Sequence, residues 1–375
     1  MDLWSSSMEG TASWRSGLAF IVDMEHRPGT TLGIRSLKKR IISRDEKGDI
    51  KSNAHSRRTA EGEESEEEGD EARIEQEQGD MYQISDEILL HYAKTGDLKG
   101  LEEHIVMHRR SSEQRLQFNA NCTDSMSPPL FYAAEGGHEE FAAFLLANGA
   151  EVDAKNHNDV TALFIAAQVG AASVVRLLMD KGADPNLRST RDDVLPLYVA
   201  CFEGHLDVVK ELLLFHNAKE CEEQGGSELP MSVNMVNAAG VGADGSTALM
   251  ASCERGHKDI VEFLLSYGAE KDARGKSGET ALMWAVQEGY FGIVELLLQR
   301  GSSVNIQKND GATPLFLAVL SGDTRMVSLL LAYGARNEIP NDQGETPRMV
   351  ARRTGLHDIA HLLLVPPPFS LVDQL

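Results

Sequence analysis

The sequence lacks an excess of positive charge. Its 375 residues include 36 Lys and Arg against 58 Asp and Glu, a formal net charge of -22 at pH 7. Proteins that bind the phosphate backbone of nucleic acids need surplus cations on the binding face. The charge balance therefore argues against direct binding of nucleic acid.

Long apolar runs and paired cysteines are also missing. No stretch has the roughly 18 apolar residues that a membrane-spanning helix needs, and Asp2 and Glu9 stand where a signal or transit peptide would be basic or apolar. The four cysteines form no CxxC pair: Cys122, Cys201, Cys221 and Cys253. We expect no membrane span, free thiols, and a cytoplasmic or nuclear protein.

Catalytic signatures are absent from the sequence as well. It has no glycine-rich phosphate loop after a strand, no GxSxG, no HExxH and no kinase catalytic loop. We therefore predict no enzymatic activity, no catalytic residue, no cofactor and no metal site. Function is expected to lie in surface recognition.

Charge divides the start of the chain into two segments. Residues 15–60 hold eleven Lys and Arg against five Asp and Glu, and residues 61–80 hold eleven Asp and Glu with Arg73 as the single cation. Such a composition buries too little apolar surface to offset chain entropy, so residues 1–84 are predicted to be a disordered tail. Ser65 precedes three glutamates and Ser112 follows two arginines, which makes both candidate phosphorylation sites.

A repeat of 33 residues governs the rest of the chain. Unit glycines recur with spacings of 33, 34, 52, 33, 33 and 33 residues, at Gly137, Gly170, Gly204, Gly256, Gly289, Gly322 and Gly355. Each is preceded by a Thr-Pro or Thr-Ala type segment rich in small residues and followed by an apolar block. The pattern predicts two short helices per unit, because proline suits a first helical turn and glycine ends a helix.

These units resemble the ankyrin-repeat family, as in Thr313-Pro314-Leu315 and the block that ends at Gly334. The resemblance implies an all-α solenoid of helix–turn–helix units with hairpin loops, and we count about eight units over residues 85–364. The spacing of 52 places a hairpin insertion at about 217–241, which either contacts a partner or is a solvated loop. Residues 365–375 are expected to be a Pro-rich C-terminal tail. His216 stands where the other units have the second glycine, and histidine is among the residues that tolerate the positive φ of such a turn.

Where the family often carries histidine after Thr-Pro-Leu, this chain has aromatic residues or Met, which we expect in the core between units. They are Phe131, Phe164, Tyr198, Met250, Met283, Phe316 and Met349. His138, His205 and His257 follow unit glycines, a position that the family uses structurally. Cys201 and Cys253 fall at small-residue core positions.

The candidate binding surface combines helix ends and hairpin tips. The two residues before each unit glycine are expected to face a partner on the concave side, and the hairpins add charges that orient it. Partner-binding candidates are Val169, Phe202, Glu203, Arg255, Glu288 and Leu320 at the helix ends, and Arg188, Arg191, Asp192, Arg274, Lys276 and Glu279 in the hairpins. Apolar Phe202 either marks an interaction surface or packs on the inserted loop. The resemblance also makes Asn186 and Asn305 candidates for asparaginyl hydroxylation.

The sequence thus predicts a non-enzymatic adaptor or scaffold, a monomeric array that binds a partner protein through the concave face. The alternative is a nuclear transcriptional cofactor or an inhibitory regulatory subunit that uses the charged tail together with the array. In that reading the basic segment directs nuclear import and the acidic segment contacts a partner.

Overall fold

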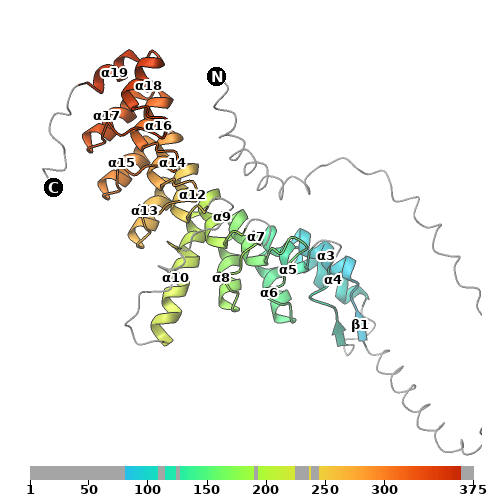
Figure 1. Ribbon diagram of the computed structural model, residues 1–375. Coiled ribbons are helices and arrows are strands. Elements are labelled where there is room, and N and C mark those ends of the chain that lie inside the picture. Colours follow the sequence, from blue (N-terminus) through green and yellow to red (C-terminus); the bar gives the residue numbers. More distant parts are fainter. Residues whose placement is uncertain are drawn as a thin grey trace, which may run out of the picture. The chain divides into compact units, whose positions relative to one another are not determined.

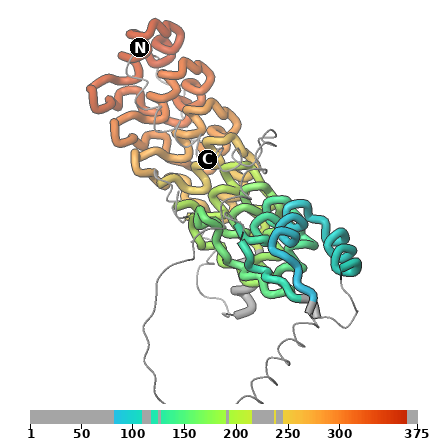
Figure 2. Tube along the Cα trace, turned by 90° about the vertical axis from the view of Figure 1, so that its right-hand side faces the viewer, coloured from blue at the N-terminus to red at the C-terminus, as the bar shows by residue number. Residues whose placement is uncertain are grey.

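In the part of the chain that the structure describes, eight pairs of antiparallel helices follow one another (Figures 1 and 2). The computed structural model describes residues 81–108, 115–123, 127–189, 193–223, 236–237 and 245–364. The pairs are α3 (Asp86–Thr95) and α4 (Leu98–His108), α5 (Pro129–Glu135) and α6 (Glu139–Ala147), α7 (Ala162–Val169) and α8 (Ala172–Asp180), α9 (Pro196–Glu203) and α10 (Leu206–Glu223), α12 (Ala248–Arg255) and α13 (Lys258–Ser266), α14 (Ala281–Gln287) and α15 (Phe291–Gln299), α16 (Pro314–Ser321) and α17 (Thr324–Ala332), and α18 (Pro347–Arg353) and α19 (His357–Leu362). The predicted all-α solenoid of eight units is confirmed.

The first helix of each unit packs against the first helix of the next, from α3 and α5 through to α16 and α18. The second helices form a parallel layer, in which α8 contacts α10 and α13 contacts α15. Helices of seven to nine residues are marginal when isolated. Stability must therefore come from contacts between neighbouring units, as in other repeat arrays.

The recurring threonines begin the first helices. The Thr313 hydroxyl accepts a hydrogen bond from the backbone N–H of Phe316 at 3.2 Å, and Thr161 accepts the equivalent bond from Phe164 at 3.3 Å. This arrangement satisfies one of the N–H groups that a helix start leaves unpaired. The Thr-Pro and Thr-Ala signals therefore act through helix capping.

The row of Phe, Tyr and Met is inter-unit core in every unit but the last. The side chains from Phe131 to Phe316 are at most 5% exposed, and those of Met250 and Met283 are 1% exposed. Met349 is 57% exposed, so the prediction is wrong at this position. The physical reason is that, among the described residues, no first helix of a further unit packs over α18 to cover it, since α19 is the second helix of the same unit.

The start of the array differs from the prediction. β1 (Met81–Gln83) and β2 (Arg115–Gln117) form a short parallel pair, and the backbone N–H of Ile84 donates to the carbonyl of Gln117 at 3.0 Å. Ile84 is 1% exposed. Residues 81–84 therefore belong to the folded unit instead of the predicted tail, because this pairing satisfies their backbone. The rest of the tail, including Ser65, and the candidate Ser112 lie outside the described residues.

Helix α10 is twice as long as its counterparts. It contains 18 residues, whereas α8 and α13 contain nine each, and it extends beyond them in Figure 1. His216 lies within this helix and does not form the expected turn, because the backbone continues its helical hydrogen bonding to Glu223. The predicted insertion at 217–241 thus begins as helix, and most of the remainder lies outside the described residues.

Candidate functional site

The residues just before the unit glycines form a row along the first helices, which we name the helix-end row. It consists of Glu135, Gly136, Gln168, Val169, Phe202, Glu203, Glu254, Arg255, Gln287, Glu288, Leu320, Ser321, Arg353 and Thr354. Val169 is 39% exposed and Arg255 is exposed, while Glu203, Glu288 and Leu320 are half-buried. The row therefore offers solvent an apolar contact and charges of both signs.

Phe202 is not an exposed contact, which corrects the prediction for this residue. Its side chain is 6% exposed. The ring is stacked on Tyr198 with a centroid distance of 6.3 Å, and the Arg255 guanidinium of the next unit lies 4.7 Å from its centre. Arg255 thus covers Phe202, and an aromatic face attracts such a cation. Phe202 serves the surface indirectly, by holding the Arg255 head group in one place.

Two charged side chains of one hairpin, Arg274 and Glu279, contact residues of the next hairpin. Arg274 donates to the carbonyl of Gln307 in the next hairpin at 2.8 Å, and Glu279 lies 3.6 Å from the ammonium of Lys308. The Glu279 and Lys308 side chains are 17% and 15% exposed, so this pair is better shielded from solvent than an ordinary surface pair. Lys276 is exposed. These contacts stabilise the hairpin edge of the units from α12 to α16.

The earlier hairpin is described only in part. Arg188 donates to the carbonyl of Asp193 at 3.0 Å and lies 3.8 Å from its carboxylate. Asp193 has a φ of 52°, a left-handed conformation that aspartate tolerates better than most residues. Arg191 and Asp192 lie outside the described residues.

Asparagines link successive hairpins. The Asn305 amide donates to the carbonyl of Gly334 at 3.0 Å and accepts from the backbone N–H of Arg336 at 2.8 Å. Asn237, inside the predicted insertion, makes the same pair of bonds with Gly268 and Glu270, at 3.2 and 2.7 Å. The insertion therefore returns to the regular hairpin path at Asn237, which the sequence analysis missed although Val236-Asn237 matches Val304-Asn305.

Asn186 occupies the corresponding place one unit earlier and is exposed. At Asn305 and Asn237, the side-chain amide donates to the carbonyl of a turn glycine in the next unit. No such turn follows Asn186, because α10 continues as a helix through position 216. The two hydroxylation candidates thus differ: Asn305 is held by two hydrogen bonds to the next unit, and Asn186 presents its side chain to solvent.

The histidines after the unit glycines connect neighbouring units. The Nε2 of His205 donates to the carbonyl of Gln168 at 2.9 Å, and that of His257 donates to the carbonyl of Phe202 at 3.0 Å. A carbonyl oxygen only accepts, so each Nε2 carries a proton. The structural role predicted for these two residues is confirmed.

Within the described ranges, no group of three or more His, Cys, Asp or Glu side chains is placed to hold a metal ion.

Buried cysteines lack the properties of nucleophiles. Cys201 and Cys253 are free thiols with no exposed surface. Burial raises the pKa of Cys201 to about 12 and raises the pKa of Cys253 as well. Since the thiolate is the reactive form, both groups are unreactive near neutral pH.

Alkylation provides a direct check. Iodoacetamide at pH 8 is expected to leave Cys201 and Cys253 unmodified in the folded protein, and to modify both in urea, as peptide mass spectrometry would show. Rapid native labelling of either thiol would contradict the structure.

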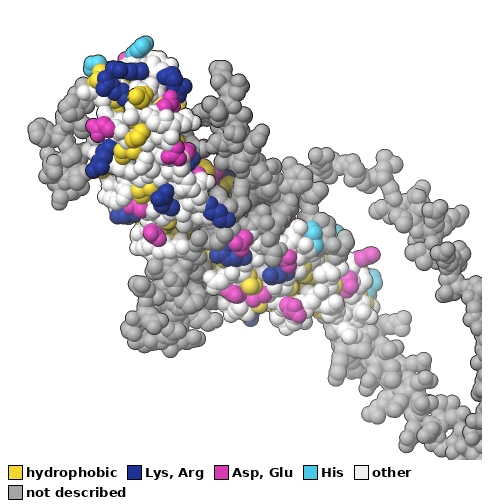
Figure 3. Space-filling model, in the orientation of Figure 1, with side chains coloured by type: hydrophobic (Ala, Val, Ile, Leu, Met, Phe, Trp, Pro, Cys, Tyr) yellow, Lys and Arg dark blue, Asp and Glu magenta, His cyan; other side chains and the backbone are white. Residues whose placement is uncertain are grey.

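Charge is unevenly distributed along the array. Residues 81–223 contain 12 Lys and Arg against 23 Asp and Glu, whereas residues 245–364 contain 12 against 14. In Figure 3, acidic side chains are prominent near α5 to α9, and Lys and Arg gather at the end that carries α18 and α19. A partner that spans the array therefore meets an acidic part and a nearly neutral part.

Paired short helices, threonine-capped starts and hydrogen-bonded hairpins define a helical repeat protein. The family model "Ankyrin repeats (3 copies)" matches residues 89–189, 130–224, 197–308 and 293–369. These matches cover well over half of the sequence, and the chain therefore belongs to the ankyrin-repeat family.

Individual relatives are more distant. The chain is 38% identical over 84 residues to the ankyrin repeat and KH domain-containing protein mask-1 of Caenorhabditis elegans, covering 22% of this chain and 3% of that protein. It is 29% identical over 198 residues to the probable E3 ubiquitin-protein ligase XBOS32 of rice, covering 49% and 38%. The crystal structure of the human ASB11 ankyrin repeat domain matches with a TM-score of 0.52 and 25% identity, over 64% of this chain and 99% of that one. The chain thus spans less than two fifths of the length of these two curated relatives.

Ankyrin repeats generally mediate protein–protein interaction, and this chain shares that fold. Among the helices that the structure describes, none is long and apolar enough to cross a membrane.

Proposed function

We propose that this chain is a non-enzymatic adaptor or scaffold that binds a partner protein through the helix-end row on the concave side of the array. The observation that carries the proposal is Arg255, an exposed guanidinium held 4.7 Å above the Phe202 ring. Arginines fixed on an aromatic face lose little side-chain entropy on binding and keep their N–H edge for a carboxylate. Exposed Val169, two units earlier, supplies an apolar contact.

The absence of an enzymatic role is part of the same proposal. It is supported by the buried, unreactive thiols and by a sequence without catalytic motifs. The ligase activity in the name of the rice relative belongs to a protein of which this chain covers 38%, and it is not carried over.

The proposal is tested by measuring the affinity of the whole chain for a captured partner protein. Val169→Asp combined with Arg255→Glu is expected to weaken binding of a captured partner by at least about tenfold, because both changes fall on solvent-facing side chains of the row. The matched control carries Val106→Asp and Arg336→Glu, two exposed positions away from the row. Affinity would be measured by titration calorimetry, with thermal melts to show that both variants fold.

Equal loss of affinity in both variants would reject the row as the binding surface. If neither variant loses affinity, recognition lies elsewhere, with the inserted segment after α10 as the next candidate.

The second candidate function is a nuclear transcriptional cofactor or an inhibitory regulatory subunit. It depends on the charged segments 15–60 and 61–80, which lie outside the described residues. Nuclear accumulation of a fluorescent protein fused to residues 1–60 would support the role as a nuclear cofactor. A fusion protein that stays in the cytoplasm would reject that role.

A further inference from the structure

Cations and aromatic rings follow the turns that join the first and second helices of the fifth, sixth and seventh units. Arg255, Lys258, Tyr290 and Arg325 are exposed there, and Phe291 is half-buried. We name the surface formed by these five side chains the turn edge. Because α12 packs against α14 and α14 against α16, three consecutive units contribute to it (Figure 1).

Aromatic rings hold two of the cations in place. The Arg325 guanidinium lies 4.9 Å from the centre of the Phe291 ring, and Arg255 makes the same kind of contact with Phe202 at 4.7 Å. In both pairs the arginine reaches back to a ring of the preceding unit. A ring face attracts the cation and restricts its motion, while the N–H edge stays available to a carboxylate.

Lys258 reaches forward to the next unit. A Cβ on Gly292 would lie 3.7 Å from the Lys258 ammonium, so this cation lies at the start of α15. The three cations therefore mark three successive unit boundaries. Arg255 lies between the fourth and fifth units, Lys258 between the fifth and sixth, and Arg325 between the sixth and seventh.

Tyr290 replaces the histidine that connects units elsewhere. His205 and His257 donate to a carbonyl of the preceding unit. The Tyr290 ring instead lies on Gly256, where a Cβ would be 2.6 Å from its Cζ, and its hydroxyl has no hydrogen-bond partner among the described residues. This hydroxyl is therefore available to a partner beside Arg255.

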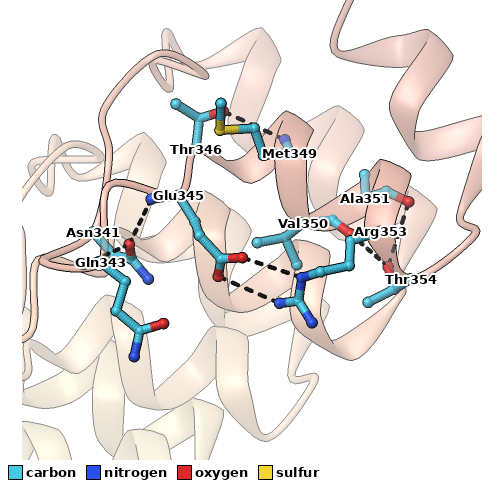
Figure 4. Close-up of polar contacts among 9 residues, drawn as sticks. All are labelled: Asn341, Gln343, Glu345, Thr346, Met349, Val350, Ala351, Arg353 and Thr354. Atoms are coloured by element: carbon cyan, nitrogen blue, oxygen red, sulfur yellow. Dashed lines mark hydrogen bonds and ion pairs between the residues drawn. The ribbon is translucent and has the colours of Figure 1, made fainter.

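The protein's own carboxylates do not neutralise the turn edge. In the part of the chain that the structure describes, none of its three cations forms an ion pair. Arg353 shows the contrast, since Glu345 accepts from its Nε at 3.1 Å and from its terminal nitrogen at 3.3 Å (Figure 4). Asp323 accepts from a backbone N–H of α17 at 3.0 Å, and Asp259 follows Lys258 directly, so the two do not share a helix face. The positive charge is therefore directed to solvent.

The spacing of the cations matches a particular peptide conformation. Neighbouring packed helices lie about 8 to 10 Å apart, which sets the distance from one unit boundary to the next. A polyproline II segment presents the same face every three residues, a rise of about 9 Å. Carboxylates at every third residue of such a segment therefore meet one cation each.

We propose that the turn edge binds an acidic segment of the partner protein in polyproline II conformation, with Asp or Glu at every third position. Its carboxylates pair with Arg255, Lys258 and Arg325, and its backbone passes over the Tyr290 ring. This inference rests on the proposed function, because Arg255 belongs to both surfaces, and it adds the chemistry of the partner.

A labelled peptide and the full chain test the inference. The probe is a fluorescein-labelled PEPPEPPEPP peptide, and the comparison peptide PPPEEEPPPP has the same composition and charge. Fluorescence anisotropy at low ionic strength is expected to show at least about fivefold tighter binding of the spaced peptide. Lys258→Glu combined with Arg325→Glu should weaken that binding at least about tenfold, because both cations become repulsive.

The matched control variant carries Lys99→Glu and Arg336→Glu, two exposed cations away from the turn edge. It has the same net charge as the turn-edge variant and should bind the spaced peptide within about twofold of the unmodified protein. Thermal melts would show that both variants fold. Equal affinity for the two peptides, or equal losses in the two variants, would overturn the inference. So would tighter binding of a single-stranded oligonucleotide of equal charge, since the edge would then recognise phosphates.

The same variants separate this inference from the proposed function. Lys258 and Arg325 lie outside the helix-end row, and Val169→Asp alone should leave the affinity for the peptide unchanged. If the peptide result fails while a captured partner still depends on Val169 and Arg255, the inference is overturned and the proposed function stands. If the peptide depends on Lys258 and Arg325 while the captured partner is insensitive to the row, the turn edge is supported and the row is rejected.

Discussion

Phe316→Ala is expected to lower the free energy of unfolding by about 3 to 5 kcal/mol, the usual cost of truncating a buried phenylalanine. Phe316 is 5% exposed between α16 and α18, so its removal leaves a cavity at a unit boundary. Met349→Ala, one unit later at the same repeat position, should cost less than about 1 kcal/mol because that side chain is 57% exposed. Urea unfolding followed by circular dichroism measures both changes.

This pair isolates the effect of a following unit. The two residues share the repeat position and the threonine-capped helix start, and they differ in whether another first helix covers them. Comparable losses for the two variants would show that Met349 is covered in solution. Repeat arrays can unfold in stages, so single-step unfolding must first be established for the parent protein.

Gly204→Ala is expected to destabilise the array by about 1 to 3 kcal/mol more than Gly149→Ala. Both glycines have left-handed backbones, with φ of 90° and 89°, so the conformational strain from an added Cβ is similar. A Cβ at Gly204 would lie 2.5 Å from the His257 ring, whereas one at Gly149 would meet nothing within 4 Å. The difference between the two variants therefore measures the contact with the next unit.

Thermal and urea unfolding of the two variants would quantify this difference. A third variant, Gly204→Ala with His257→Ala, removes the ring that the new methyl group meets. It also removes the hydrogen bond from His257 to the carbonyl of Phe202, so partial recovery is the expected result. Equal costs for the two single glycine changes would contradict the close packing at Gly204.

These contacts bear on recognition because they hold the helix-end row in place. His257 connects to the backbone of Phe202, and Phe202 supports the Arg255 guanidinium on its ring. A binding surface built on such contacts is ordered before the partner arrives, which reduces the entropic cost of association. The proposed function and the inter-unit packing therefore involve the same residues.

Much of the fold was predictable from periodicity. The 33-residue spacing, the threonine helix starts and the unit glycines specify helix pairs, because each signal reports local backbone conformation. The unit count and the burial of the aromatic and methionine row from Phe131 to Phe316 followed from the same pattern, whereas Met349 is exposed. The pair β1 and β2 was missed because it joins residues more than 30 positions apart, and only three residues of each strand take part.

The sequence by itself determined the repeat, its eight units and the family, since each depends on residues that are close in the chain. Tertiary structure alone decided which candidate side chains reach solvent. Phe202 and Val169 look alike as apolar residues at helix ends, yet Phe202 is 6% exposed and Val169 is 39% exposed. The two residues differ in repeat position, since Phe202 lies two residues before its unit glycine and Val169 one residue before. Gln168, at the position that corresponds to Phe202, is also buried, and at Phe202 the Arg255 guanidinium of the next unit adds cover.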